Sequence, residues 1–126
     1  MGMASWDKTK AVAALDANAK EASHGLCAEY TRRAIEAGGV TLVRHTSAED
    51  YGPSLTGVGF VALMAPPPVY LPADVGIVQA IPGHPNGHMA MYDGTCWVSD
   101  FKQLHGLYPS PAYRAANPPF TIYRFP

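Results

Sequence analysis

Prolines occupy only one part of the chain, and this limits the possible folds more than any other feature. All 12 prolines lie at or after residue 53, whereas residues 5–37 are rich in Ala, Lys and Glu and contain a single glycine, Gly25. Because proline disrupts helix interiors and central strands, longer helices are expected only in the first third. The remainder alternates Val, Tyr and Phe with Pro and Gly, which is typical of short strands and turns. We therefore predict an α+β fold with N-terminal helices packed on a small antiparallel sheet.

Length and charge narrow the class of protein. The chain has 126 residues, is 48% hydrophobic and carries a formal net charge of −1. We predict one domain over residues 1–126, with helices within 7–37 and the sheet and loops over 38–126. The near-neutral charge argues against a nucleic-acid partner. No apolar run approaches the ~18 residues needed to span a membrane, and the N-terminus lacks the pattern of a signal peptide. We expect a monomer made in the cytoplasm.

Two helices are predicted in the proline-free part. Apolar residues spaced by three and four positions indicate a first helix over residues 7–22, with Ser5 or Asp7 as its cap. The segment around Gly25 interrupts this pattern. A second helix is expected over residues 26–37, ended by two glycines.

Four segments after residue 70 are predicted strands, namely 74–81, 88–92, 96–101 and 120–125. A two-residue Asp93-Gly94 turn is expected to join the second and third of these strands. The last segment could close the sheet.

The remaining segments are expected to be mostly irregular. Residues 40–44 read as a short strand or extended exit, and residues 45–68 as a loop in which 59–65 weakly indicates a buried strand. The proline-rich segment 108–119 is predicted to be an irregular loop, and no functional role is assigned to it.

Cys27 is a candidate nucleophile because it lies at the start of the second predicted helix. Unpaired amides and the helix dipole favour an anion there, which favours the thiolate and can hold an oxyanion during acyl transfer. The other interpretation is a small buried cysteine packed against the sheet.

His88 is the candidate base, because it opens a strand directly after a Gly-rich loop. Its orienting partner depends on the register of the hairpin. With a two-residue turn His88 lies opposite Ser99, and with one more residue it lies opposite Asp100. Asp100 is preferred because a carboxylate orients an imidazole and stabilises its cation.

These residues lie in motifs that resemble those of NlpC-type and CHAP-type peptidoglycan amidases, over roughly residues 20–125. The segment His24–Ala34 resembles the motif around their nucleophilic cysteine. Leu71–Val78 is similar to the proline, small residue, Asp and strand that precede their histidine. Gly87–Gly94 resembles the hairpin of that histidine, and Trp97–Phe101 lies where the third polar residue is placed.

The resemblance implies a papain-like core without a cofactor and hydrolysis of an amide bond in the peptide stem of peptidoglycan. Cys27 would attack the carbonyl, His88 would act as base and then acid, and an acyl-enzyme would form. A catalytic domain of this size resembles type VI secretion amidase effectors or compact phage lysins. That implies delivery to the periplasm or wall of a target bacterium, and an immunity protein as inhibitor.

Further residues are expected at the substrate groove, namely His24, Leu26, His84 and Trp97. Histidines 24, 84 and 88 with Cys27 also have the ligand types of a zinc site, but Pro85 prevents a helical presentation of the second pair, and we predict no metal.

Two other interpretations of the whole chain are open. One is a non-enzymatic binding module with a Cys27–Cys96 disulfide. The other is the same cysteine chemistry directed at a protein substrate, as in deamidase toxins.

Overall fold

The computed structural model describes residues 6–23 and 25–126 and confirms an α+β fold. Its helices are α1 (Lys8–Asn18), α2 (Cys27–Ala37), the 3-10 helix η1 (Ala48–Tyr51), α3 (Gly52–Gly57) and α4 (Pro111–Ala116). Its strands are β1 (Val61–Ala62), β2 (Val75–Val78), β3 (His88–Tyr92), β4 (Trp97–Val98), β5 (Lys102–Gln103) and β6 (Phe120–Arg124). Among these residues, no helix is both long and apolar enough to cross a membrane.

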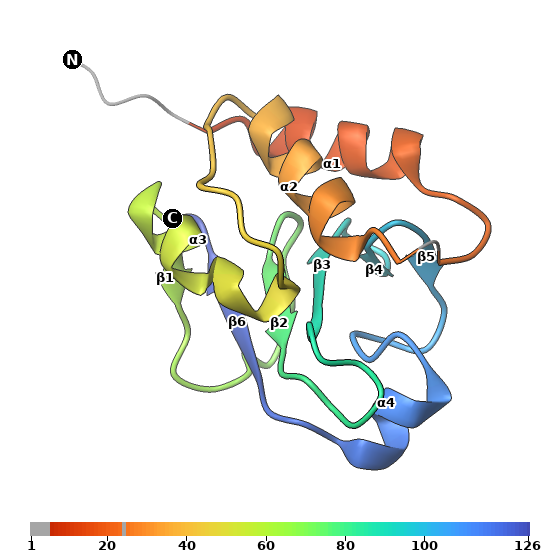
Figure 1. The fold of residues 1–126 in the computed structure, drawn as a ribbon. Coiled ribbons are helices and arrows are strands. Elements are labelled where there is room, and N and C mark those ends of the chain that lie inside the picture. Colours follow the sequence, from red (N-terminus) through yellow and green to blue (C-terminus); the bar gives the residue numbers. More distant parts are fainter. Residues whose placement is uncertain (1–5, 24) are drawn as a thin grey trace.

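The sheet has six strands in the order β1-β6-β2-β3-β4-β5, and every pairing is antiparallel. Alternate residues of its strands face two separate hydrophobic clusters, as the pleat requires. One cluster joins the sheet to α1 and α2, which Figure 1 shows side by side over it. The other cluster contains Tyr113 of α4. The sheet is therefore covered on both faces, and β3 contributes residues to both clusters.

The first helix is shorter than residues 7–22. Asp7 is its N-cap, and the carboxylate accepts a hydrogen bond from the amide of Lys10 at 3.0 Å. The alternative cap, Ser5, lies outside the described residues. After Asn18 the chain extends, and the Lys20 amide donates to the Asp100 carbonyl at 2.7 Å. Pairing with a distant segment therefore replaces the last helical turn.

The turn between β3 and β4 is longer than the predicted two residues. The Asp93 carboxylate accepts hydrogen bonds from the amides of Thr95 and Cys96, both at 2.8 Å. This side-chain bridging extends the turn over 93–96, so Tyr92 pairs with Trp97. Both predicted registers are therefore wrong. His88 lies beyond the end of β4 and pairs with Val78 of β2 instead.

Two segments predicted to be loops contain helices. Within 45–68 the chain forms η1 and α3, and 108–119 contains α4. In α3 and α4 a proline lies in the first turn, where its missing N–H costs no hydrogen bond. The strand expected in 59–65 is present only as β1, which is exposed rather than buried. The predicted closing strand, β6, lies between β1 and β2 and not at the edge.

Three features fix the central strands β2, β3 and β6 relative to their neighbours. The Thr31 hydroxyl of α2 donates to the Met89 carbonyl of β3 at 3.3 Å. Gly87, directly before His88, has φ +70°, and a Cβ there would collide with the carbonyl oxygen of Val78. Asp74 precedes β2, is buried, and receives two hydrogen bonds from Arg124 at 2.9 and 2.8 Å.

Candidate active site

Cys27 is the first residue of α2, and its half-buried side chain lies at the head of this helix. The backbone amides of Met89, Cys27 and Ala28 lie near its sulfur and act to lower the thiol pKa. Because Met89 follows His88 directly, the sulfur is held next to the start of β3. The thiol is therefore beside the strand that carries the predicted base, on a helix that is hydrogen-bonded to that strand.

His88 is buried, and its Nε2 lies 2.6 Å from the side-chain Oε1 of Gln103. The Gln103 amide nitrogen donates to the carbonyls of Gly106 and Leu107, both at 2.9 Å. Since both N–H bonds of the amide are used there, its oxygen is the atom that faces the imidazole and can only accept. In the neutral ring, Nε2 therefore carries the proton and Nδ1 is the basic atom. Sequence analysis missed Gln103, which lies beyond the predicted third strand.

Asp100 is fully buried and fixes the chain that leads into α2. Its Oδ2 accepts from the amide of Leu26 at 3.0 Å and from the hydroxyl of Ser23 at 3.4 Å. Ser99 is also buried, and its hydroxyl donates to Asp100 Oδ1 at 3.3 Å. The ring partner of His88 in this structure is thus Gln103, while Asp100 acts as a cap for α2 from a distant part of the chain.

Two cavities meet at Cys27. The histidine cavity, of about 360 Å³, contains His88, His84 and Tyr113 in its lining. The arginine cavity, of about 310 Å³, lies between α2 and residues 44–51 and contains Arg32 and Arg44 in its lining. Gly25, Cys27 and Asn86 line both cavities. The thiol therefore lies on a groove that extends on both sides of it.

The residues predicted for the groove divide into three groups. Leu26 is exposed at the arginine cavity and His84 is exposed at the histidine cavity. Trp97 is buried in the second hydrophobic cluster, packed on Tyr70 and Tyr92 at centroid distances of 5.0 and 5.4 Å. Its place in the core therefore contradicts the groove prediction. His24 lies outside the described residues.

Tyr113 is a residue of the site that the sequence analysis did not single out. It is buried, and its ring lies 5.2 Å from that of His84 and 6.1 Å from that of His88. Burial, with the charges of Cys27 and Glu49, raises the pKa of Tyr113 to about 12. The phenol stays protonated at neutral pH and so remains a hydrogen-bond donor at the histidine cavity.

Both cysteines are free, which excludes the Cys27–Cys96 disulfide. Within residues 6–23 and 25–126, no group of three or more His, Cys, Asp or Glu side chains could hold a metal ion.

Comparison with known proteins identifies the family. The sequence matches no protein-family model and no curated protein at a significant level. Among solved structures it is similar to the type VI native effector-immunity complex Tae3-Tai3 from Ralstonia pickettii. The identity is 50% and the TM-score 0.89, and the match covers 96% of this chain and 100% of the other. The selenomethionine form of that complex matches at 52% identity and a TM-score of 0.84, covering 90% and 98% of the two chains. The chain belongs to the Tae3 family of type VI amidase effectors.

Without substrate, Cys27 and His88 of this Tae3-family chain are both uncharged. Burial raises the pKa of the Cys27 thiol, an effect that the neighbouring amides oppose and the Asp100 charge reinforces. Burial lowers the pKa of His88 to about 4, against the opposing effects of Gln103 and Asp100. At neutral pH the thiol is therefore protonated and the imidazole is neutral. Such a pair can act by general-base catalysis, with proton transfer during attack.

Proposed function

We propose that the chain is a cysteine amidase or endopeptidase that cleaves the peptide stem of bacterial peptidoglycan. The observation that carries the proposal is the shared cavity: Cys27 at the head of α2 and His88 at the head of β3 line the same hollow. Membership of a family of amidase effectors supports hydrolysis of an amide bond as the reaction of this pair. The packing of a cysteine helix against an antiparallel sheet supports a papain-like core, and residues 1–126 are proposed to act as one catalytic domain and as a monomer.

The first step is attack on the scissile carbonyl. His88 Nδ1 takes the proton of the thiol as the sulfur forms its bond to the carbonyl carbon, and the carbonyl oxygen becomes an oxyanion. The amides of Cys27 and Ala28 lie at the sulfur and stabilise this charge. The Leu26 amide does not take part, because it donates to Asp100.

The second step releases the amine. The imidazolium returns its proton to the leaving nitrogen as the C–N bond breaks, which leaves a thioester on Cys27. Water, deprotonated by the same nitrogen, then adds to the thioester and frees the acid and the thiol. Gln103 accepts the hydrogen bond from Nε2 throughout, which leaves Nδ1 as the atom that takes and returns the proton.

We assign the orienting role to Gln103, in place of Asp100 or Ser99. Asp100 contributes in a different way, since its charge favours the imidazolium and its carboxylate holds the start of α2. A neutral acceptor stabilises the imidazolium less than a carboxylate would, which fits a base that is neutral at rest.

The delivery of the protein and its inhibition are proposed from its family membership. As a type VI amidase effector, the chain is proposed to reach the periplasm or wall of a target bacterium, and an immunity protein is proposed to inhibit it. The Tae3 structures hold such a complex.

Digestion of purified peptidoglycan tests the proposal. The wild-type protein and the control Cys96→Ala are expected to release new stem fragments, detected by mass spectrometry, whereas Cys27→Ala is expected to release none. If the wild-type protein leaves the wall intact while a thiol reagent still labels Cys27, the substrate is not peptidoglycan. In that case, protein substrates and deamidation become the alternative.

A further inference from the structure

The geometry points to a carboxylate-binding subsite in the arginine cavity, built by Arg44 and Arg32, that selects acidic peptides for cleavage at Cys27. The inference rests on the proposed function, because it describes the substrate of the same site. It adds which chemical group of the substrate is recognised and which residues recognise it.

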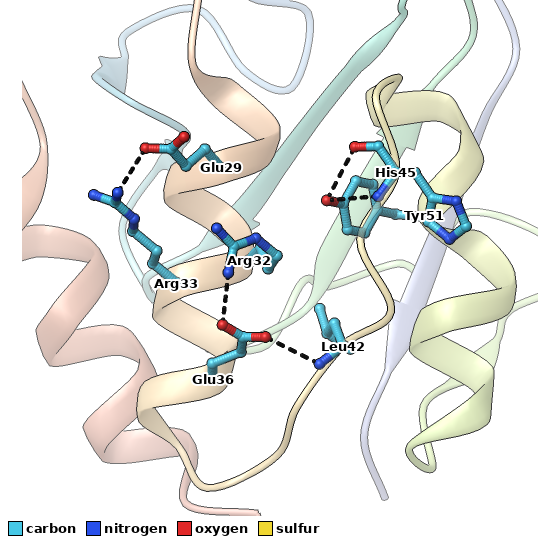
Figure 2. A network of polar contacts seen from close by, with 7 residues as sticks. All are labelled: Glu29, Arg32, Arg33, Glu36, Leu42, His45 and Tyr51. Atoms are coloured by element: carbon cyan, nitrogen blue, oxygen red, sulfur yellow. Dashed lines mark hydrogen bonds and ion pairs between the residues drawn. The ribbon is translucent and has the colours of Figure 1, made fainter.

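Arg32 is a fixed cation in the wall of this cavity. Its side chain is only 8% exposed, and it donates to Glu36 Oε1 at 2.7 Å. The other oxygen of Glu36 accepts from the Leu42 amide at 3.1 Å. Figure 2 shows this chain of contacts between α2 and the segment that carries His45. Glu36 therefore ties the guanidinium and that segment to one another.

Arg44 lies two residues after Leu42, is exposed and lines the cavity. In the described part of the chain, no carboxylate forms an ion pair with it. Its neighbours on the chain are well held, because the amide and carbonyl of His45 both bond to the Tyr51 hydroxyl, at 3.1 and 3.3 Å. Ser54 bonds both the His45 ring, at 2.7 Å, and the Val43 carbonyl, at 2.8 Å. A rigid segment thus presents a guanidinium without a counter-ion.

The charges around the cavity favour an anion. The carboxylate that lines it, Glu29, is paired with Arg33 at 2.9 Å. Figure 2 shows this pair on the side of α2 away from His45 and Tyr51. Among the described residues, Arg44 is then the lining charge that no carboxylate pairs with, and Arg32, held by Glu36, lines the same cavity. Guanidinium groups bind carboxylates in a planar, bidentate manner, which gives direction as well as affinity.

The position of the subsite defines the ligand. The same cavity is lined by Cys27 and Ala28, so a group bound by Arg44 belongs to a residue next to the scissile bond. An extended peptide lying in the groove would place its reacting carbonyl at the sulfur and a free carboxylate at the guanidinium. The preferred substrate is therefore a peptide with a free carboxylate close to the cleaved amide.

Paired substrates test the subsite. One synthetic stem peptide keeps its free carboxylates, and a second has them converted to amides. We expect wild-type kcat/KM to be roughly 10- to 100-fold higher for the free acid, the effect of one charge-assisted hydrogen bond. In Arg44→Gln this preference should disappear, through loss on the acidic peptide. The control Arg114→Gln removes the same charge from α4, outside the cavity lining, and should keep the preference.

A binding measurement separates this inference from the proposed function. The Cys27→Ala protein, titrated calorimetrically with the two peptides, should bind the free acid more tightly, and Cys27→Ala with Arg44→Gln should bind both equally. Hydrolysis of both peptides at equal rates, or equal binding by Cys27→Ala, would overturn the subsite and leave the proposed function intact. If no variant hydrolyses either peptide, the proposed function fails and the binding preference alone decides the subsite.

Discussion

The two regions around the cysteines differ in what surrounds the sulfur, although the sulfurs themselves are alike. Cys27 and Cys96 are both free and half-buried, and burial raises the pKa of both thiols. The Cys96 sulfur lies 4.0 Å from Asp93 Oδ2, and the charge of Asp16 also acts on it. The Cys27 sulfur instead has three backbone amides near it that act to lower its pKa, and a cavity beside it.

The direction of the pKa shift does not distinguish the proposed nucleophile from the other thiol. In both regions the thiol is protonated at neutral pH. Carboxylates raise the thiol pKa in both regions, Asp100 at Cys27 and Asp93 with Asp16 at Cys96, where Lys102 opposes them. The Cys27 region differs in having backbone amides that favour negative charge and the neutral imidazole of His88 in the same cavity. A nucleophile is thus defined by the groups that act during the reaction.

The largest expected effect is that of Cys27→Ala. This substitution should lower the rate of stem-peptide cleavage by at least roughly 10³-fold, because the covalent route is lost. The melting temperature should stay close to that of the wild type, since one small side chain replaces another. Residual cleavage within tenfold of the wild-type rate would contradict the assignment of Cys27 as the nucleophile.

The pH dependence of stability should reveal the neutral base. Because the pKa of His88 falls from 6.5 to about 4 on folding, the unfolded chain binds more protons between these values. The contribution of neutral His88 to the free energy of unfolding is therefore present above pH 6.5 and lost as the pH falls towards 4. We expect wild type to lose about 2–3 kcal/mol more than His88→Gln over this range, measured by denaturant unfolding. Asp16, whose pKa is raised to about 6, has the opposite sign but is present in both proteins.

Removal of Gln103, the proposed orienting residue, should leave Cys27 without a correctly held base. Gln103→Ala is expected to lower kcat roughly 10- to 100-fold with little change in KM, because the imidazole is retained but no longer held. Gln103→Glu should raise the pKa of His88 and move the acid limb of the pH–rate profile upward.

Asp100→Asn is the matched control for Gln103. Its main expected effect is on stability, a loss of about 1–3 kcal/mol, because Asp100 is a buried carboxylate that accepts from the Leu26 amide. A larger loss of kcat in Asp100→Asn than in Gln103→Ala, at unchanged stability, would return the orienting role to Asp100.

The smallest effect is expected for Cys96→Ser. Activity should remain within about twofold of wild type, because Cys96 lies in the turn after β3 and does not line either cavity at Cys27. Reaction of the native protein with iodoacetamide, followed by peptide mapping, should label the two thiols to different extents. Loss of activity in Cys96→Ser would contradict the comparison.

Much of the architecture was predictable because local patterns determine it. The β3 boundaries, the position of Cys27 at a helix start and the Asp7 cap were confirmed. Helices α3 and α4 were not predicted, because the prolines in their segments indicate loops as readily as first helical turns. The Ser110-Pro111 pair, a cap followed by a first-turn proline, is the signal that could have revealed α4.

The third member of the site could not be found from local patterns. Its position depends on the Asp93 carboxylate, which lengthens the turn and shifts β4 relative to β3. The short β5 then returns Gln103 alongside Trp97. Two hydrogen bonds to one turn carboxylate thus determine which residue meets the imidazole, and the alternation of residues along the strands does not predict them.

The protonated state of Cys27 has a consequence for durability. Peroxides and other oxidants attack the thiolate form of cysteine, and they attack the neutral thiol far more slowly. Since burial raises the pKa of the Cys27 thiol, we expect peroxide to oxidise this sulfur more slowly than an exposed cysteine of ordinary pKa.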